Sequence, residues 1–116
     1  MDERHPFDIE GELFSYRVGG VLIKDNKILL TNDGDDYSLL GGHSQIGETS
    51  KETIIREFKE ETGFDVEVVN VISTFEYFWK WSDKKSHQLC IYSRLIMINE
   101  NQELVPNPDT SNTKYL

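Results

Sequence analysis

The pattern of apolar and polar positions along this chain predicts several β-strands. Segments rich in apolar, β-branched and aromatic residues, which are typical of strands, lie at 13–24, 27–31, 37–40, 66–78 and 88–98. Asp25 and Asn26 fit a hairpin turn after the first of these, and the polar segment 79–87 is expected to be a hairpin loop. Residues 1–12 are polar and are expected to form an arm or a short edge strand.

Between these strands, residues 49–63 predict an α-helix whose two ends are specified by local chemistry. Thr49 can cap the start, and Glu52 three residues later completes a capping box. Gly63 stands where a helix needs a residue in the left-handed conformation to end. One side carries an apolar arc that is expected to pack on the core, formed by Ile54, Ile55 and Phe58.

The same helix carries an acidic face. Glu57, Glu60 and Glu61 stand at i, i+3 and i+4, which places three carboxylates on one face within a turn. Their mutual repulsion and the helix dipole both oppose this arrangement, because the C-terminal half of a helix favours cations. A bound divalent cation would reverse the effect, and magnesium prefers such oxygen donors. A solvated acidic face without metal is the alternative.

The segment 41–64 resembles the Nudix box, G-x5-E-x7-R-E-U-x-E-E-x-G-U, in which U is a bulky apolar residue. Every specified position fits: Gly42, Glu48, Arg56, Glu57, Phe58, Glu60, Glu61, Gly63 and Phe64. The similarity extends over about residues 13–98. Leu40 stands where many relatives carry proline, and Gln45 stands where relatives often carry glutamate.

The resemblance implies an α+β fold, namely a Nudix-type α/β/α sandwich with a mixed β-sheet. We expect residues 1–116 to form a single domain with the box at 42–64 and a polar tail at 99–116, in which Tyr115 and Leu116 begin another strand. No second helical pattern follows residue 98, so the domain is expected to lack the usual C-terminal helix of the family. The strands 66–78 and 88–98 are apolar on both alternating sets, which is typical of strands buried on both sides. The chain is therefore expected either to form a homodimer or to be shorter than the natural protein.

Composition narrows the functional classes. A chain of 116 residues suits one small domain, and its single cysteine, Cys90, excludes an internal disulfide. The net charge of −9 argues against binding to a nucleic-acid backbone, although metal ions could bridge the protein to phosphates. The sequence lacks the apolar run of a signal peptide and any stretch long enough to span a membrane. A soluble, cytoplasmic protein is expected.

By resemblance, the chain is expected to be a metal-dependent hydrolase that cleaves a diphosphate linkage in a nucleoside diphosphate derivative. The cofactor implied is Mg2+, with Mn2+ as an alternative. The family's metal ligands map onto the Gly42 carbonyl, Glu48, Glu57, Glu60 and Glu61. Catalytic roles map onto Arg56, Glu57 and Glu60, with Glu57 as general base oriented by Arg56. A non-catalytic nucleotide-sensing or interaction domain on the same fold is the alternative.

Further residues are candidates for contacts with substrate. Arg17, Gly41 and His43 are candidates for binding it, although Arg17 could equally form a surface ion pair and Gly41 could serve only a tight turn. Aromatic residues that could stack on a nucleobase, or pack in the core, are Tyr77, Phe78, Trp79 and Trp81. Downstream acids that could replace Glu57 as the base are Glu76, Asp83, Glu100 and Glu103.

Overall fold

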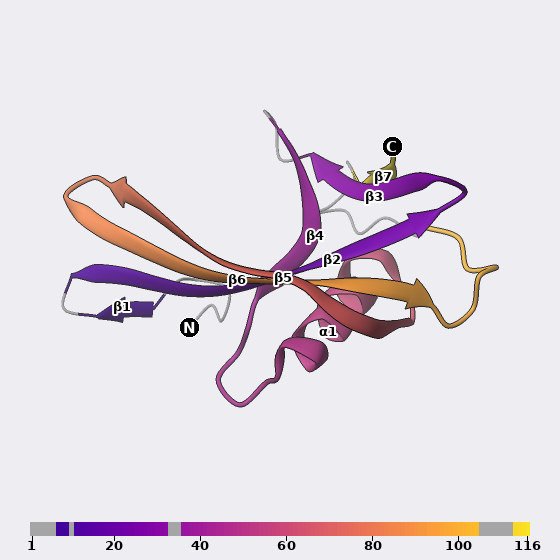
Figure 1. Ribbon diagram of the computed structural model, residues 1–116, viewed down its shortest axis with the longest axis horizontal. Coiled ribbons are helices and arrows are strands. Elements are labelled where there is room, and N and C mark those ends of the chain that lie inside the picture. The colour runs from indigo at the N-terminus through magenta and orange to yellow at the C-terminus, as the bar shows by residue number, and fades with distance from the viewer. Residues whose placement is uncertain (1–6, 10, 33–35, 105–112) are drawn as a thin grey trace.

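The computed structural model describes residues 7–9, 11–32, 36–104 and 113–116. Its strands form one mixed sheet and its helix packs against one face of that sheet (Figure 1). In chain order the elements are β1 (Phe7–Ile9), β2 (Glu12–Lys24), β3 (Lys27–Asn32), β4 (Tyr37–His43), α1 (Ser50–Thr62), β5 (Val66–Trp81), β6 (Lys84–Met97) and β7 (Lys114–Tyr115). Among the described residues, no helix is long and apolar enough to cross a membrane.

Six of the seven described strands follow the order β5-β6-β2-β4-β3-β7, and the seventh, β1, pairs with the start of β2. The β2–β6 pair is parallel and the remaining pairs are antiparallel, which makes the sheet mixed. This arrangement confirms the α+β architecture expected from the sequence. The edge strand expected in the arm is β1, whereas residues 1–6 of the arm and 105–112 of the polar tail lie outside the described residues.

Two hairpins test the predicted turns. Asp25 and Asn26 both have positive φ, 52° and 62°, as a two-residue turn of the mirror-image type requires, so the first turn is confirmed. The predicted loop at 79–87 is wrong, because β5 continues to Trp81 and β6 begins at Lys84. This end of the hairpin extends beyond the core and is exposed to solvent. A strand in that position can carry polar residues on both faces, so its sequence resembles that of a loop.

Helix α1 has the ends that the sequence predicts. The Glu52 backbone N–H donates to Thr49 Oγ1 at 3.1 Å, and the Thr49 N–H donates to Glu52 Oε1 at 3.1 Å. Gly63 ends the helix with φ 79°, and its N–H donates to the Lys59 carbonyl. The capping box and the glycine stop are therefore both present.

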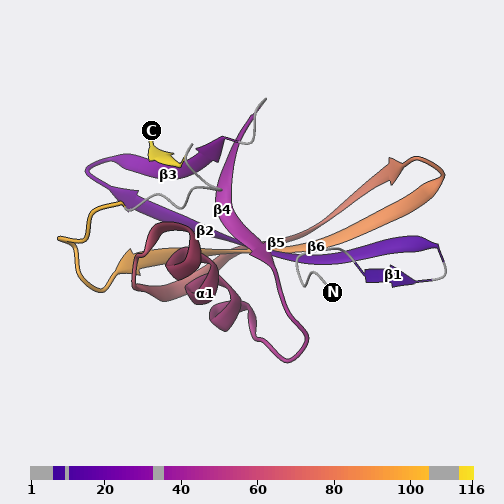
Figure 2. The same ribbon diagram turned by 180° about the vertical axis from the view of Figure 1, so that it is seen from behind.

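The core lies between α1 and the face of the sheet that it covers. Phe58 packs so closely that a Cβ at Gly20 would lie 2.6 Å from its ring. Buried apolar residues that form this core are Val18, Leu22, Leu29, Leu40, Ile54, Phe58, Phe64, Val66, Leu95 and Met97. Helix α1 lies behind β5 and β6 in Figure 1 and in front of them in Figure 2.

We call the sheet face opposite α1 the open face. In β2 the core residues alternate with positions on the open face, namely Arg17, Gly19, Val21 and Ile23. Within the described part of the chain, α1 is the one helix, and residues 69–78 of β5 are all exposed. The expectation that this strand is buried on both sides is therefore wrong for residues 69–78, because the described part of the chain covers neither of its faces there.

Candidate functional site

The site that the sequence singles out begins at the end of β4. Gly41 lies within this strand and not in the tight turn considered for it, and Gly42 follows it in the strand. Gly47 (φ 92°) supplies the positive φ of the following loop. A Cβ at Gly41 would overlap the carbonyl oxygen of Val18 on β2. A Cβ at Gly42 would lie 2.5 Å from the carboxyl group of Glu57. The two glycines therefore permit close approach of a strand and of a carboxylate.

The loop after β4 fixes the carboxylate of Glu48. Its Oε1 accepts the Gln45 N–H at 3.1 Å and the Thr53 hydroxyl at 3.0 Å. Thr53 Oγ1 also lies 3.0 Å from Ser44 Oγ, and both side chains are buried. Glu48 therefore takes one orientation from its own loop and from the first turns of α1. Ser44 and Thr53 were missed from the sequence, where the one available signal was a polar threonine beside the apolar arc.

Arg56 connects the acidic residues. Its Nε and Nη2 donate to the two carboxylate oxygens of Glu48 at 2.7 and 3.0 Å, which is a bidentate pair. Its Nη1 donates to Glu57 Oε1 at 2.9 Å and lies 3.4 Å from Glu60 Oε2. Nη2 also reaches the His43 carbonyl at 3.4 Å. One guanidinium thus joins the end of β4, the loop and the helix.

This contact network sets the charge states of its members. The guanidinium of Arg56 lowers the pKa of Glu48 from 4.5 to about 2, against the opposing effect of burial. The hydrogen bond with Glu48 in turn raises the pKa of Arg56 above its ordinary value. At neutral pH both groups are therefore charged. Glu57 is only 1% exposed and contacts both Gly42 and Arg56, so its side chain is held in place.

A divalent metal needs several oxygen donors that meet at one point. Across the residues that the structure describes, no three His, Cys, Asp or Glu side chains meet closely enough to hold an ion. The carboxylates of Glu48, Glu57 and Glu60 instead surround Arg56, and Glu61 follows on α1, half-buried. The donors are all oxygen atoms, which magnesium prefers. The donor atoms are therefore of the type that magnesium prefers. In this structure the positive charge of Arg56 compensates the negative charges of the carboxylates.

The three candidates for substrate contact lie together on two neighbouring strands. Arg17 is the Cα partner of His43, and Gly41 is the partner of Gly19, so these positions share the open face near the end of β4. Arg17 Nη2 reaches the Leu39 carbonyl at 3.4 Å, and no ion pair of this arginine is recorded among the described residues.

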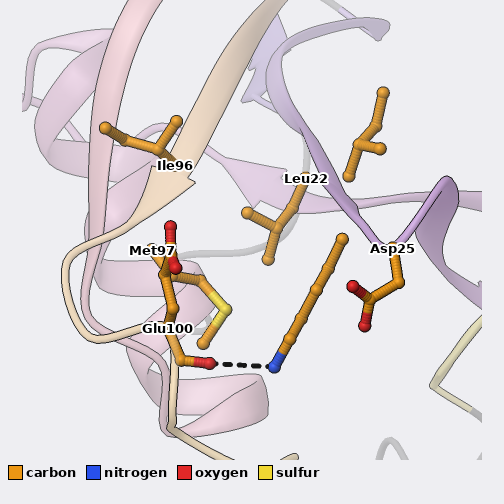
Figure 3. Close-up of a pocket in the computed structure, with 7 residues that line it drawn as sticks. Leu22, Asp25, Ile96, Met97 and Glu100 are labelled. Carbon is orange, nitrogen blue, oxygen red and sulfur yellow. Dashed lines mark hydrogen bonds between the residues drawn. The ribbon is translucent and has the colours of Figure 1, made fainter.

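Other candidates lie elsewhere. Glu76 contacts His87 Nε2 at 2.6 Å, and Asp83 lies in the β5–β6 turn, at the end of the molecule away from α1 (Figure 1). Lys24 Nζ donates to the Glu100 carbonyl at 2.9 Å in a pocket of about 260 Å³ that contains no box residue (Figure 3). Glu103 is exposed in the segment after β6.

The candidate aromatic residues divide between the two faces of the sheet. The rings of Tyr77 and Trp79 contact each other, with centroids 5.4 Å apart. Phe78 lies on the other face against His87, at 4.3 Å between ring centroids. The side chain of Trp81 lies outside the described residues.

Comparisons with known proteins place this geometry in a family. The sequence model of the NUDIX domain matches residues 14–115. An ADP-ribose pyrophosphatase of Methanocaldococcus jannaschii is 38% identical over 63 residues, which are 50% of this chain and 37% of that protein. The putative ADP-ribose pyrophosphatase YjhB of Bacillus subtilis is 35% identical over 72 residues, 60% of this chain and 32% of that protein. The chain thus spans about a third of the length of these relatives.

Solved structures agree with the fold. A crystal structure of a UDP-X diphosphatase has a TM-score of 0.72 at 23% identity, covering 87% of this chain and 49% of that one. A MutT NUDIX hydrolase from Burkholderia pseudomallei has a TM-score of 0.68 at 17% identity, covering 90% and 83%. At these identities the likeness concerns the fold alone. With the family match over 14–115 and the complete box, the chain belongs to the Nudix family.

Proposed function

We propose that this protein is a magnesium-dependent hydrolase that cleaves the diphosphate linkage of a nucleoside diphosphate derivative. The observation that carries the proposal is the group of carboxylates around Arg56, with Glu57 held against Gly42. The named relatives act on compounds of this kind, being an ADP-ribose pyrophosphatase and a UDP-X diphosphatase. The described strands share one sheet, which supports a single domain for this activity.

In this proposal the metal is held by carboxylates of α1 and of the loop before it. The ligands would be the Gly42 carbonyl, Glu48, Glu57, Glu60 and Glu61. When bound, the ion would neutralise charge on the phosphates and lower the pKa of a water molecule. Manganese could replace magnesium, since both are hard cations that accept oxygen donors.

The chain itself supplies orientation and a base. Arg56 donates to Glu57 Oε1 at 2.9 Å, so Glu57 Oε2 is the atom that would take the proton of the attacking water. The bidentate pair with Glu48 keeps the guanidinium of Arg56 in one plane, which fixes that orientation. Glu76 and Asp83 are less suited as the base, because they lie on the β5–β6 hairpin and not on α1 or the loop before it, where the box carboxylates lie.

A panel of nucleotide sugars, dinucleotides and nucleoside triphosphates with magnesium tests the activity. We expect hydrolysis of at least one diphosphate compound, with loss of turnover on chelation. Failure of every substrate, with nucleotide binding retained, would instead support the non-catalytic sensing domain.

Calorimetry with magnesium or manganese tests the metal site separately. The double variant Glu57→Gln, Glu61→Gln should bind the ion much more weakly than the original chain. Glu67→Gln, which removes one exposed acid from β5, is the control and should leave the affinity unchanged. Equal affinity in the double variant would show that these residues do not bind the metal.

A further inference from the structure

The outer edge of the sheet at β5 is regular and unprotected. Among the described strands, β5 is the first of the sheet and pairs with β6 alone. Its register shifts lie before Ser73, so the stretch from Ser73 to Trp81 runs evenly beside β6. Prolines, short strands and bulges usually protect a sheet edge, and this stretch has none of the three. Its outer backbone groups are therefore arranged to pair with a further strand.

Aromatic side chains extend this edge on both faces. Phe78 is 64% exposed and lies against His87 on one face, at 4.3 Å between ring centroids. Tyr77 is 56% exposed and contacts Trp79 on the open face, at 5.4 Å. Aromatic side chains are enriched in the contact surfaces of proteins. The edge therefore offers apolar contacts in addition to backbone hydrogen bonds.

The charges on this stretch are Glu76 and Lys80, which lie two residues to either side of Phe78 and on its face. Lys80 is the Cα partner of Lys85 on β6, and like charges directly opposite each other destabilise a strand pair. Within the residues that the structure describes, no ion pair of Lys80 is recorded. An acidic residue across the outer edge would compensate this charge.

A second copy of the same strand supplies that acid in one register. When two identical strands pair antiparallel about a two-fold axis, one residue lies opposite itself and the others pair symmetrically around it. With Phe78 on the axis, Glu76 of each copy lies opposite Lys80 of the other, and Tyr77 lies opposite Trp79. With Glu76 or Lys80 on the axis, that residue would lie opposite its own like charge. Phe78 is the one axis position in this stretch that pairs Glu76 with Lys80.

We propose that two copies of this chain pair through their β5 edges, antiparallel and with Phe78 on the two-fold axis. The two sheets then form one continuous sheet, in which residues 75–81 of each copy are paired. The pairing does not depend on the proposed function, because this end of the hairpin lies away from α1 (Figure 1).

The expected dimer is weak and reversible. The paired stretch is short beside the interface of a permanent dimer. The net charge of −9 on each copy also opposes association. At about 0.15 M salt, exposed charges more than about 8 Å apart are largely screened from each other, whereas residues paired across an edge lie closer than this. Salt of this concentration therefore suits the measurement.

Charge reversal tests the register by sedimentation velocity over a range of protein concentrations. The original chain should shift from monomer to dimer as its concentration rises. Lys80→Glu places an acid opposite Glu76 at two positions and should raise the dissociation constant at least about fivefold. The double variant Glu76→Lys, Lys80→Glu exchanges the two charges and should restore the original constant. Lys51→Glu, at an exposed position of α1, changes the net charge equally and is the control, which should have a much smaller effect.

Oxidative cross-linking tests which residue lies on the axis. Residues directly opposite each other in an antiparallel pair have Cα atoms about 4.5–5.5 Å apart, a distance that a disulfide can span. Phe78→Cys should therefore cross-link the two copies quickly. Thr74→Cys is the matched control, because Thr74 is exposed on the same face of β5 but would lie opposite Ser82, about 26 Å from its own copy. The original chain controls for Cys90, which is buried.

Three results would overturn the proposal. The first is a monomer at every concentration, which would leave the edge to a different protein. The second is an equal effect of Lys80→Glu and Lys51→Glu, and the third is equal cross-linking of Phe78→Cys and Thr74→Cys. Melting curves check that each variant is folded. If Lys80→Glu melts early, Lys80→Gln replaces it and should still weaken the dimer, because the attraction to Glu76 is lost.

Discussion

Two neighbouring glycines of β4 offer a sharp test, because alanine would meet a different obstacle at each. At Gly42 the obstacle is the carboxyl group of Glu57, with its carbon and one oxygen 2.5 Å from the added Cβ. At Gly41 the obstacle is backbone, since the Cβ would overlap the Val18 carbonyl and lie 2.8 Å from Gly19 Cα. Gly42→Ala should therefore damage the site, and Gly41→Ala should damage the fold.

The expected size of each effect follows from these distances. Ordinary contact with a Cβ begins at 3.4 Å, so the Glu57 carboxylate, now at 2.5 Å, must retreat by nearly 1 Å. A displacement of about 1 Å in a catalytic group can lower the rate by about 100-fold. The end of a side chain moves at small energetic cost, so the melting temperature should change by only a few degrees.

Gly41→Ala has no such escape. The added Cβ meets only main-chain atoms of β2, which cannot rotate away, so the pairing of β2 with β4 must open at the Gly19–Gly41 position. Forcing extra atoms into a packed site typically costs about 1–3 kcal/mol, and backbone overlap falls at or above the upper end. For a domain of this size each kcal/mol lowers the melting temperature by roughly 3–6 °C. At about 3 kcal/mol, a loss of roughly 9–18 °C is therefore expected.

The assay pairs thermal melting with kcat/KM, using magnesium and whichever diphosphate the substrate panel identifies. The decisive comparison is the ratio of lost activity to lost stability in the two variants. If Gly42→Ala keeps activity within threefold of the original, the position of Glu57 against Gly42 does not matter for the reaction. If the two variants lose the same stability, our distinction between a side-chain and a backbone obstacle is wrong.

Three further changes have defined outcomes. Glu57→Gln should lower kcat by at least 100-fold while melting changes by a few degrees, because the amide can still accept from Arg56; normal turnover of the folded variant would refute its role as base. Thr49→Ala should cost about 1 kcal/mol in urea unfolding through the lost cap, with unchanged activity at low temperature; an unaltered midpoint would contradict this. In metal-free protein, ionised Glu48 should contribute at most about 3 kcal/mol to the free energy of unfolding. This contribution should be complete above pH 4.5 and lost as the pH falls towards 2, so Glu48→Gln should flatten the dependence of unfolding free energy on pH in that range.

Much of the fold was predictable because the signals were local. The cap at Thr49, the stop at Gly63 and the turn at Asp25-Asn26 each depend on a few adjacent residues, and the structure confirms all three. The end of the β5–β6 hairpin was not, because its strands continue beyond the core and lose the apolar alternation by which strands are identified. The pairing of β2 with β6, far apart in sequence, has no local signature at all.

The candidate site shows the same division. Spacing on one helix was enough to bring Glu57 and Glu60 together around Arg56. The support of Glu48 by Ser44 and Thr53 depends on how the loop folds back on α1, which spacing does not encode. The hydrogen bond between Ser15 of β2 and Gln88 of β6 likewise depends on strand register, which spacing along the chain does not encode.

The exposed edge strand β5 has a consequence for how this protein behaves in solution. Among the described strands, β5 pairs with β6 alone, and a long apolar strand with one unpaired side is a template for pairing with another chain. At neutral pH the net charge of −9 repels a second copy, so colloidal stability depends on the acids and not on the shape of the edge. The sequence pI is about 4.7, so mild acidification should reduce that repulsion. Turbidity at mildly acidic pH should therefore rise with protein concentration and fall when Phe75 or Tyr77, both exposed on β5, is replaced by lysine.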